Sequence, residues 1–251
     1  MNADRQPAVS ALGGRRAVAE ALASGRAREV VVADGVQMTP GLREAVDAAR
    51  ATSVPVRRAP RTELDRLARD HRGIVALLGP AAVSSMGERE LAGLAFAEDA
   101  VVVALDGIED PQNLGAVART CDAAGVAELV TRVKRAADAT PAAVRASAGA
   151  LLHLPHARVA NITRALERLQ GIGFQVAGLD GSAEASIYDD PCPTGRVVLV
   201  VGSEGSGLSR LVRERCDRLI RLPMGGHVGS LNASAAAAAA LYGWVMPSRR
   251  R

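Results

Sequence analysis

The chain has 251 residues and a formal net charge of +4 at pH 7, and aromatic side chains make up only 2% of it. This length suffices for one or two domains with buried cores. The mild positive charge suits a polyanionic partner without requiring one, and the scarcity of aromatic residues argues against a platform on which nucleobases stack.

The cysteines, the histidines and the hydropathy pattern argue against a disulfide-bonded, a zinc-binding and a membrane protein. Cys121, Cys192 and Cys216 show no CxxC spacing, and their odd number predicts free thiols in a reducing compartment. Four scattered histidines form no zinc constellation, so no metal is expected. No apolar run approaches a membrane span, and the N-terminus lacks a signal-peptide core. We therefore expect a cytoplasmic protein without a membrane partner.

The first part of the chain predicts a small α/β domain. Residues 1–10 are expected to be a disordered lead-in. Over residues 11–80, helical stretches such as GGRRAVAEALASG alternate with strand-like stretches such as EVVVADG and GIVALLG. This pattern predicts a compact unit of roughly seventy residues, a plausible size for an accessory module. Residues 81–97 are interpreted as a linker with one short helix.

The second domain is expected over residues 98–248 and begins with the apolar strand AVVVALDG. Strands and helices then alternate as far as an alanine-rich final helix, which predicts an α/β fold with a parallel sheet. Periodicity alone favours an ordinary doubly wound sheet, because knots are nearly absent from proteins. Polar loops follow three of the apolar strands, which predicts a ligand site at the carboxyl edge of the sheet.

The first polar loop carries Asn113 and, six residues later, Arg119. Asn113 could simply cap the helix that follows Pro111, and Arg119 could lie on a solvated helix face. Yet the helix is almost entirely small or apolar, which makes a single arginine on it conspicuous. From these residues alone, a structural and a functional interpretation are equally good.

The second polar loop follows the strand VVLVV and reads GSEGSG, with glycines spaced G-x-x-G-x-G. A dinucleotide-binding loop has the reverse spacing, and Glu204 would repel a pyrophosphate. S-adenosylmethionine has no phosphate and carries a positive sulfonium, so a carboxylate in this loop is electrostatically compatible with it. A tight turn with an exposed glutamate is an equally good interpretation of the loop alone.

The third polar loop ends in Ser230-Leu231-Asn232-Ala233-Ser234 before six alanines. Serine and asparagine are common helix caps, and alanine is the best helix former, so a capped helix explains much of the pattern. The polar positions beyond the cap are left unexplained, and small residues allow a helix to pass close to other backbone.

Together, the motifs N-x5-R, G-x-E-G and S-L-N-x-S resemble those of the SpoU-type (TrmH-like) RNA ribose 2′-O-methyltransferases of the SPOUT superfamily. The chain is most similar to the bacterial branch that methylates a guanosine of 23S rRNA. The resemblance implies a trefoil knot at the C-terminal end of the second domain and S-adenosyl-L-methionine as the methyl donor. The catalytic residues that it implies are Asn113, Arg119, Glu204, Ser230 and Asn232. Those implied to bind the donor are Gly202, Leu222, Leu231 and Ser234.

The N-terminal part resembles the ribosomal-protein L30e-like domain that recognises RNA in this branch, through ALGGRRAVAEAL and DHRGIVA. The branch often has Gln at the position of Arg72 and Pro at that of Val133, and these departures concern the RNA target rather than the donor site. Lys134 is the only lysine; arginine favours bidentate phosphate contacts, although a GC-rich genome explains the same bias. The expected RNA contacts are Arg15, Arg16, Lys134, Arg135 and Arg145.

The resulting hypothesis is S-adenosylmethionine-dependent 2′-O-methylation of RNA, foremost of a guanosine in 23S rRNA. A tRNA target and an antibiotic-resistance methylation of rRNA remain alternatives. An NAD-dependent oxidoreductase would need a G-x-G-x-x-G loop and a ribose-binding acid about twenty residues later, and the chain has neither. The complete set of motif residues argues against an RNA-binding protein without activity. A homodimer that buries Trp244 or its neighbours is expected, because the final helix ends in large apolar residues.

Overall fold

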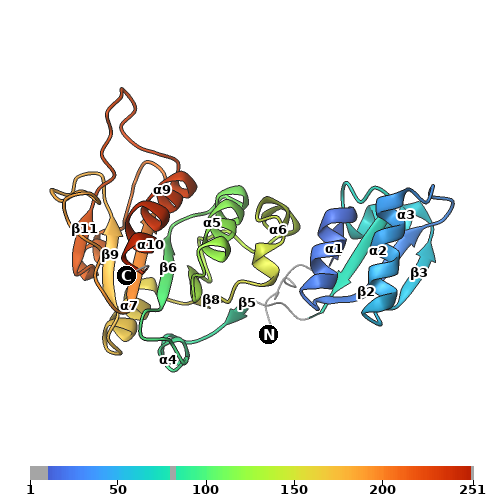
Figure 1. The fold of residues 1–251 in the computed structure, drawn as a ribbon, viewed down its shortest axis with the longest axis horizontal. Coiled ribbons are helices and arrows are strands. Elements are labelled where there is room, and N and C mark those ends of the chain that lie inside the picture. The colour runs from blue at the N-terminus through green and yellow to red at the C-terminus, as the bar shows by residue number, and fades with distance from the viewer. Residues whose placement is uncertain (1–10, 80–82, 250–251) are drawn as a thin grey trace.

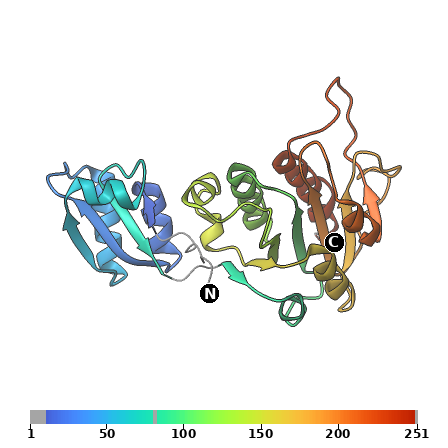
Figure 2. The ribbon, with the colours of Figure 1, turned by 180° about the vertical axis from the view of Figure 1, so that it is seen from behind.

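The computed structural model describes residues 11–79 and 83–249, so the lead-in expected at residues 1–10 lies outside the described part. These residues form two units joined end to end (Figure 1), which we call the N-terminal unit (residues 11–79) and the C-terminal unit (residues 83–249). The same division is visible from behind in Figure 2. The α/β class expected from the sequence is confirmed in both units.

The N-terminal unit has a four-stranded sheet with the order β1-β4-β2-β3, in which β4 runs antiparallel to β1 and β2, and β3 runs parallel to β2. The elements are β1 (Ala11–Gly13), α1 (Arg15–Ala23), β2 (Ala27–Ala33), α2 (Pro40–Ala51), β3 (Val56–Ala59), α3 (Arg61–Leu67) and β4 (Ile74–Leu78). The first helix is shorter than expected, because Gly14 at φ 95° separates it from a strand. Only glycine readily adopts this backbone conformation.

The C-terminal unit has a seven-stranded sheet with the order β11-β9-β10-β6-β7-β8-β5, and every pair of neighbours is parallel. Its strands are β5 (Val83–Ser85), β6 (Val101–Asp106), β7 (Glu128–Arg132), β8 (His156–Val159), β9 (Gln175–Leu179), β10 (Val197–Gly202) and β11 (Arg218–Ile220). Its helices are α4 (Glu88–Ala92), α5 (Pro111–Ala123), α6 (Pro141–Ala146), α7 (Ile162–Gln170), α8 (Arg210–Arg215), α9 (Ala233–Ala240) and α10 (Met246–Ser248).

Two parts of this unit differ from the sequence expectation. The stretch interpreted as a linker contains β5, which pairs with β8 at the edge of the sheet. The stretch PAAVRASAGALLHL predicts one helix after Thr140. The helix ends at Ala146, because Ala148 at φ 50° and Gly149 at φ 90° turn the chain back. The strand β8, which no sequence pattern indicated, follows this turn.

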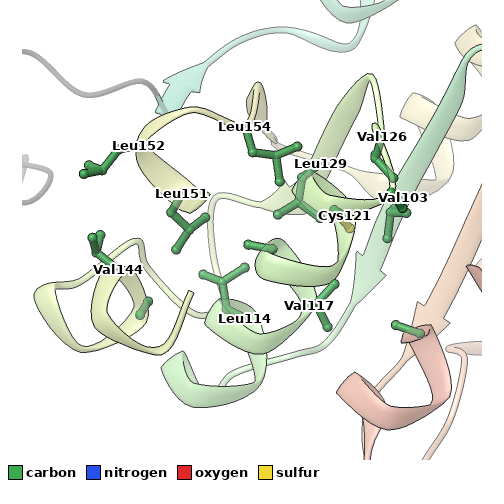
Figure 3. Packing of buried hydrophobic residues seen from close by; sticks show 14 of the residues in the cluster. Val103, Leu114, Val117, Cys121, Val126, Leu129, Val144, Leu151, Leu152 and Leu154 are labelled. Atoms are coloured by element: carbon green, nitrogen blue, oxygen red, sulfur yellow. The ribbon is translucent and has the colours of Figure 1, made fainter. Parts of the chain in front are cut away.

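Apolar side chains cover both faces of the seven-stranded sheet. Helices α4, α7 and α8 pack on one face, and α5, α6 and α9 pack on the other. Figure 3 shows how Leu114 and Val117 of α5 lie against Val103 and Leu129 of the sheet, all fully buried. Each such side chain contributes about 1.5–3 kcal/mol through removal from water. This packing fixes α5, whose first turn carries Asn113.

The C-terminal end of the chain corrects one expectation. After α9, a π-helical turn (Leu241–Val245) brings Trp244 into the unit's own core, where it is 3% exposed and donates from Nε1 to the carbonyl of Asp190 at 2.5 Å. Trp244 therefore needs no second chain to cover it, because it is already buried in the hydrophobic cluster that also contains Ile187 and Leu241. Within the described residues, no helix has the length and apolarity required to cross a membrane.

Gly115 permits a close approach of α5 and α6 that a side chain would prevent. A Cβ atom there would lie 2.5 Å from the carbonyl oxygen of Ala143 and 2.5 Å from the Cβ atom of Ala146. Alanine is a better helix former than glycine by about 1 kcal/mol. We nevertheless expect Gly115→Ala to lower the free energy of unfolding by roughly 1–3 kcal/mol, because both helices must move apart. Urea denaturation measures this difference.

Gly226→Ala is the matched control, because nothing lies within 4 Å of the Cβ position there. It should change the free energy of unfolding by less than about 0.5 kcal/mol. Equal stability of Gly115→Ala and the wild type would contradict the close packing of α5 on α6.

Candidate functional site

Three loops meet at the carboxyl edge of the sheet. Strands β6 and β10 are neighbours, and their last residues, Asp106 and Gly202, face each other in register. The loop after β6 leads into α5, the loop after β10 contains Glu204, and the loop after β11 leads into α9 through Asn232. Parallel strands bring these loops together because all of them end at the same edge.

One carboxylate joins the three loops. Glu204 Oε1 accepts a hydrogen bond from Asn113 Nδ2 at 2.9 Å and a second, short one from Asn232 Nδ2. Asn232 Nδ2 also donates to Asn113 Oδ1 at 2.9 Å. The sequence separations of the three residues are large, so only the fold can bring them together. We call Asn113, Glu204 and Asn232 the polar trio.

Helix capping does not explain Asn113. The N-cap of α5 is Asp110, whose Oδ1 accepts from the backbone amide of Gln112 at 3.0 Å. The side chain of Asn113 is therefore free to contact Glu204. Asn232, in contrast, has both roles: its Oδ1 accepts from the amide of Ser234 at 2.9 Å and caps α9, while its Nδ2 belongs to the polar trio.

The loop after β10 folds back on the strand that it leaves. Ser203 and Gly207 exchange two backbone hydrogen bonds of 3.1 and 3.0 Å. A side chain on Gly202 would overlap the backbone of Gly207, so glycine is required at this position. The buried carboxylate of Asp106 accepts from the amide of Ser209 at 2.7 Å and holds the far end of the loop against β6.

A cavity of about 370 Å³ lies beside this loop. Glu204 and Ser230 of the expected catalytic residues line it, together with Gly202, Leu222 and Leu231 of the expected donor-binding residues. Ser234 is not in the lining; its hydroxyl donates to Asn232 Oδ1 at 2.5 Å instead.

The cavity also contains an ion pair that the sequence analysis missed. Arg213 Nε lies 3.2 Å from Asp180 Oδ2, and Asp180 Oδ1 accepts from the amide and hydroxyl of Ser182 at 2.8 and 2.6 Å. Burial raises the pKa of Asp180, but the Ser182 hydrogen bonds and the charge of Arg213 outweigh it and hold the pKa below its usual value. The strand-like stretch FQVAGLD could have indicated Asp180 as a site residue, because it ends in this aspartate at the same edge of the sheet.

Arg119 does not join the polar trio. It is exposed, and the six residues that separate it from Asn113 correspond to about 9 Å of helix and a different face of α5. Arg119 lines a second cavity, between the two units, together with Arg15, Arg16 and Arg145. Lys134 and Arg135 lie after β7 and line neither cavity. Among the described residues, no group of three His, Cys, Asp or Glu side chains is arranged to hold a metal ion.

Comparisons with protein families match both units. The family model of the SpoU rRNA methylases matches residues 100–242. A second family model, described as RNA 2′-O ribose methyltransferase substrate binding, matches residues 12–83.

Individual relatives match along nearly the whole chain. A Staphylococcus epidermidis protein assigned to the TrmH family of tRNA/rRNA methyltransferases is 37% identical over 231 residues, which are 91% of this chain and 92% of that protein. An uncharacterized tRNA/rRNA methyltransferase of Mycobacterium ulcerans is 42% identical over 231 residues, or 91% of this chain and 74% of that protein. The crystal structure of the SpoU methyltransferase AviRb from Streptomyces viridochromogenes, in complex with the cofactor AdoMet, superposes with a TM-score of 0.77, 26% identity and coverage of 96% and 90%.

The polar trio requires one carboxylate facing two amides, which a charge exchange can test. Asn232→Asp places a second carboxylate beside Glu204, and Glu204→Gln leaves only amides. Each substitution should lower the free energy of unfolding by on the order of 1 kcal/mol at pH 8.

The double variant, Asn232→Asp with Glu204→Gln, is the control because it restores one carboxylate and still caps α9. It should recover most of the stability, and thermal denaturation of the four proteins measures the coupling. Additive losses of stability in the double variant would show that the two side chains do not interact.

Proposed function

This chain belongs to the SpoU rRNA methylase family and is an RNA methyltransferase, and on that premise we propose that it methylates ribose 2′-hydroxyls of RNA with S-adenosylmethionine as donor. The observation that supports this proposal best is the junction of Asn113, Glu204 and Asn232 beside a cavity whose wall is a glycine-rich backbone loop. This junction places polar side chains where the methyl donor and the ribose hydroxyl that accepts the methyl group would meet.

The charge and size of the cavity beside Gly202 suit S-adenosylmethionine. Its volume of about 370 Å³ lies in the range of small-molecule sites. The carboxylates of Glu204 and Asp180 outnumber the single guanidinium of Arg213 in the lining. This excess of negative charge favours a ligand with a sulfonium cation. The backbones of Gly202, Leu222 and Leu231 would hold the adenosine and methionine parts of the donor.

Methyl transfer requires that an oxygen–carbon bond forms while the sulfur–carbon bond breaks, and that the hydroxyl proton passes to solvent water. S-adenosylmethionine supplies a methyl group on a cationic sulfur that leaves as a neutral thioether. The polar trio and Ser230 fix the geometry, and holding reactants in line can remove roughly 7–11 kcal/mol of barrier. Arginine is a poor base at its normal pKa, so we assign Arg119 the orientation of the ribose and its phosphate.

For the RNA target, we propose a guanosine of 23S rRNA, and tRNA and a resistance site of rRNA remain alternative targets. The proposal rests on the motif resemblance, since the relatives are named for tRNA and rRNA together. We further propose that residues 11–80 recognise the RNA and that residues 98–248 carry out the transfer. The trefoil knot at the C-terminal end stays a prediction.

Arg119→Ala should lower the rate of methyl transfer by about 100-fold or more, because the acceptor is no longer oriented. The affinity for S-adenosylmethionine, measured by isothermal titration, should stay within about twofold of the wild type, because Arg119 does not line that cavity. The assay follows a labelled methyl group into rRNA and tRNA from cells that lack this gene, with mapping of ribose methylation.

Arg168→Ala is the matched control, because it removes an exposed arginine from the last turn of a helix on the other face of the sheet. Near-normal turnover of Arg119→Ala would exclude Arg119 from the mechanism. Absence of transfer by the wild-type protein to any RNA, or transfer to a base instead of a ribose, would contradict the proposed function.

We also propose that the protein is a homodimer through the region of its last helix. Trp244 no longer supports this, but both tyrosines of the chain are exposed, Tyr188 by 76% and Tyr242 by 47%. They lie on segments that contact each other, since Gly243 is adjacent to Ile187. Large exposed apolar side chains that gather on one surface are typical of interfaces.

Sedimentation equilibrium should therefore show a dimer at micromolar concentration, and Tyr188→Arg should shift it toward the monomer by at least about tenfold in dissociation constant. Leu94→Arg is the control, because Leu94 is also exposed, by 38%, but follows α4 at the opposite face of the sheet. A fully active protein that is monomeric at all concentrations would contradict the dimer.

A further inference from the structure

A polar cavity between the two units is separate from the cavity beside Gly202. It has a volume of about 750 Å³, and residues of both units line it. The N-terminal unit contributes residues of α1 and the loop with Asp70 and Arg72. The C-terminal unit contributes Arg119 of α5 and residues 144, 145, 148 and 149. In Figure 1, α1 of the N-terminal unit faces α6 of the C-terminal unit, and both helices contribute residues to the lining.

Positive charge dominates this cavity. Five arginines line it, from four separate parts of the chain: Arg15, Arg16, Arg72, Arg119 and Arg145. All five are exposed. None of their side chains forms a hydrogen bond or an ion pair within the part of the chain that the structure describes.

The acidic residues in the lining do not neutralise these arginines. Only Glu20 and Asp70 are present, and the Glu20 carboxylate lies 3.8 Å from Nε2 of His153 in the other unit. Three excess positive charges in the lining of one cavity favour the binding of anions, because a concave surface concentrates their field. The cavity therefore fits an anionic ligand.

The backbone around the cavity is unusual as well. Three of the five non-glycine residues with positive φ in the described chain line it: Asp70 (56°), Arg72 (50°) and Ala148 (50°). Such conformations cost on the order of 1 kcal/mol each and tend to occur at functional sites. They place turns from both units opposite each other.

We propose that this cavity binds the sugar–phosphate backbone of the RNA acceptor strand, and that both units contribute to the same phosphate site. This inference rests on the proposed function. Guanidinium groups match phosphate oxygens bidentately, and no aromatic residue lines the cavity to stack a base. The site therefore positions the strand and does not read its sequence.

The location of Arg119 connects this site to the reaction. Arg119 and Asn113 belong to one helix, α5, and Asn113 belongs to the polar trio beside Gly202. A strand whose phosphate is held at Arg119 is thereby directed along α5 toward the polar trio. If the N-terminal unit bound RNA without help from the C-terminal unit, arginines of the C-terminal unit would not be needed in the same cavity.

The test uses the full-length chain with Arg16→Ala, Arg72→Ala and the double variant. Arg66→Ala is the matched control, because it removes an exposed arginine from the same unit, on α3, outside the cavity. RNA affinity is measured by fluorescence anisotropy from low to high salt. The KM for RNA, the kcat at saturating RNA and the affinity for S-adenosylmethionine are measured alongside.

Arg16→Ala and Arg72→Ala should each raise the Kd and the KM for RNA by about 5–10-fold. Each should also reduce the slope of log Kd against log salt concentration by about 0.7–0.9 for every phosphate that the variant no longer neutralises. The kcat and the donor affinity should stay within about twofold, and Arg66→Ala should resemble the wild type. Circular dichroism and thermal melting verify that each variant is folded.

The outcomes separate this site from the proposed function. If the double variant binds RNA with the wild-type affinity and salt slope while the wild type methylates RNA, the phosphate site is wrong and the function stands. An effect of Arg66→Ala equal to that of Arg72→Ala would also overturn the site, because net charge alone would then explain the weaker binding. If RNA binding falls as expected but the wild type methylates no RNA, the phosphate site stands and the proposed function fails.

Discussion

The site depends on a single carboxylate that three distant segments share. Glu204 accepts from the amides of Asn113 and Asn232, so the loop after β10 is connected to the start of α5 and to the start of α9. Amide side chains are weak partners in water but effective ones for a charge, because hydrogen bonds to ionised groups contribute about 1.5–3 kcal/mol. Without this carboxylate, the loop after β10 would lose its side-chain hydrogen bonds to the starts of α5 and α9.

The rest of the C-terminal unit makes that contact possible. The parallel sheet sets β6 and β10 side by side, Asp106 fastens the loop at Ser209, and Gly202 allows the loop to lie on its own strand. The same helix that brings Asn113 to Glu204 presents Arg119 to the arginine-lined cavity between the units. One helix, packed closely on α6 at Gly115, thus carries both a member of the polar trio and an arginine of the cavity between the units.

Much of this could be predicted from the sequence, because strongly apolar strands such as VVLVV and alternating helices have clear periodicity. The residues Asn113, Glu204 and Asn232 were recognised through motifs, and the structure brings them together. The strand β8 was not predicted because PHARVA is short and contains a polar residue, His156. In the structure His156 is buried and forms a hydrogen bond with Thr131. The pair of Asp180 and Arg213 and the separation of Arg119 from the trio depend on tertiary placement, which local patterns do not encode.

The edge strand β5 has a consequence for how the two units work together. Because Val83 is already bound to the sheet through β8, only five peptide steps separate it from Leu78, the last residue of β4. A chain of this length spans at most about 18 Å. The N-terminal unit is therefore closely tethered. In the proposed function, an RNA strand bound to this unit would meet α5 at a high effective concentration and would lose little further entropy in the second contact.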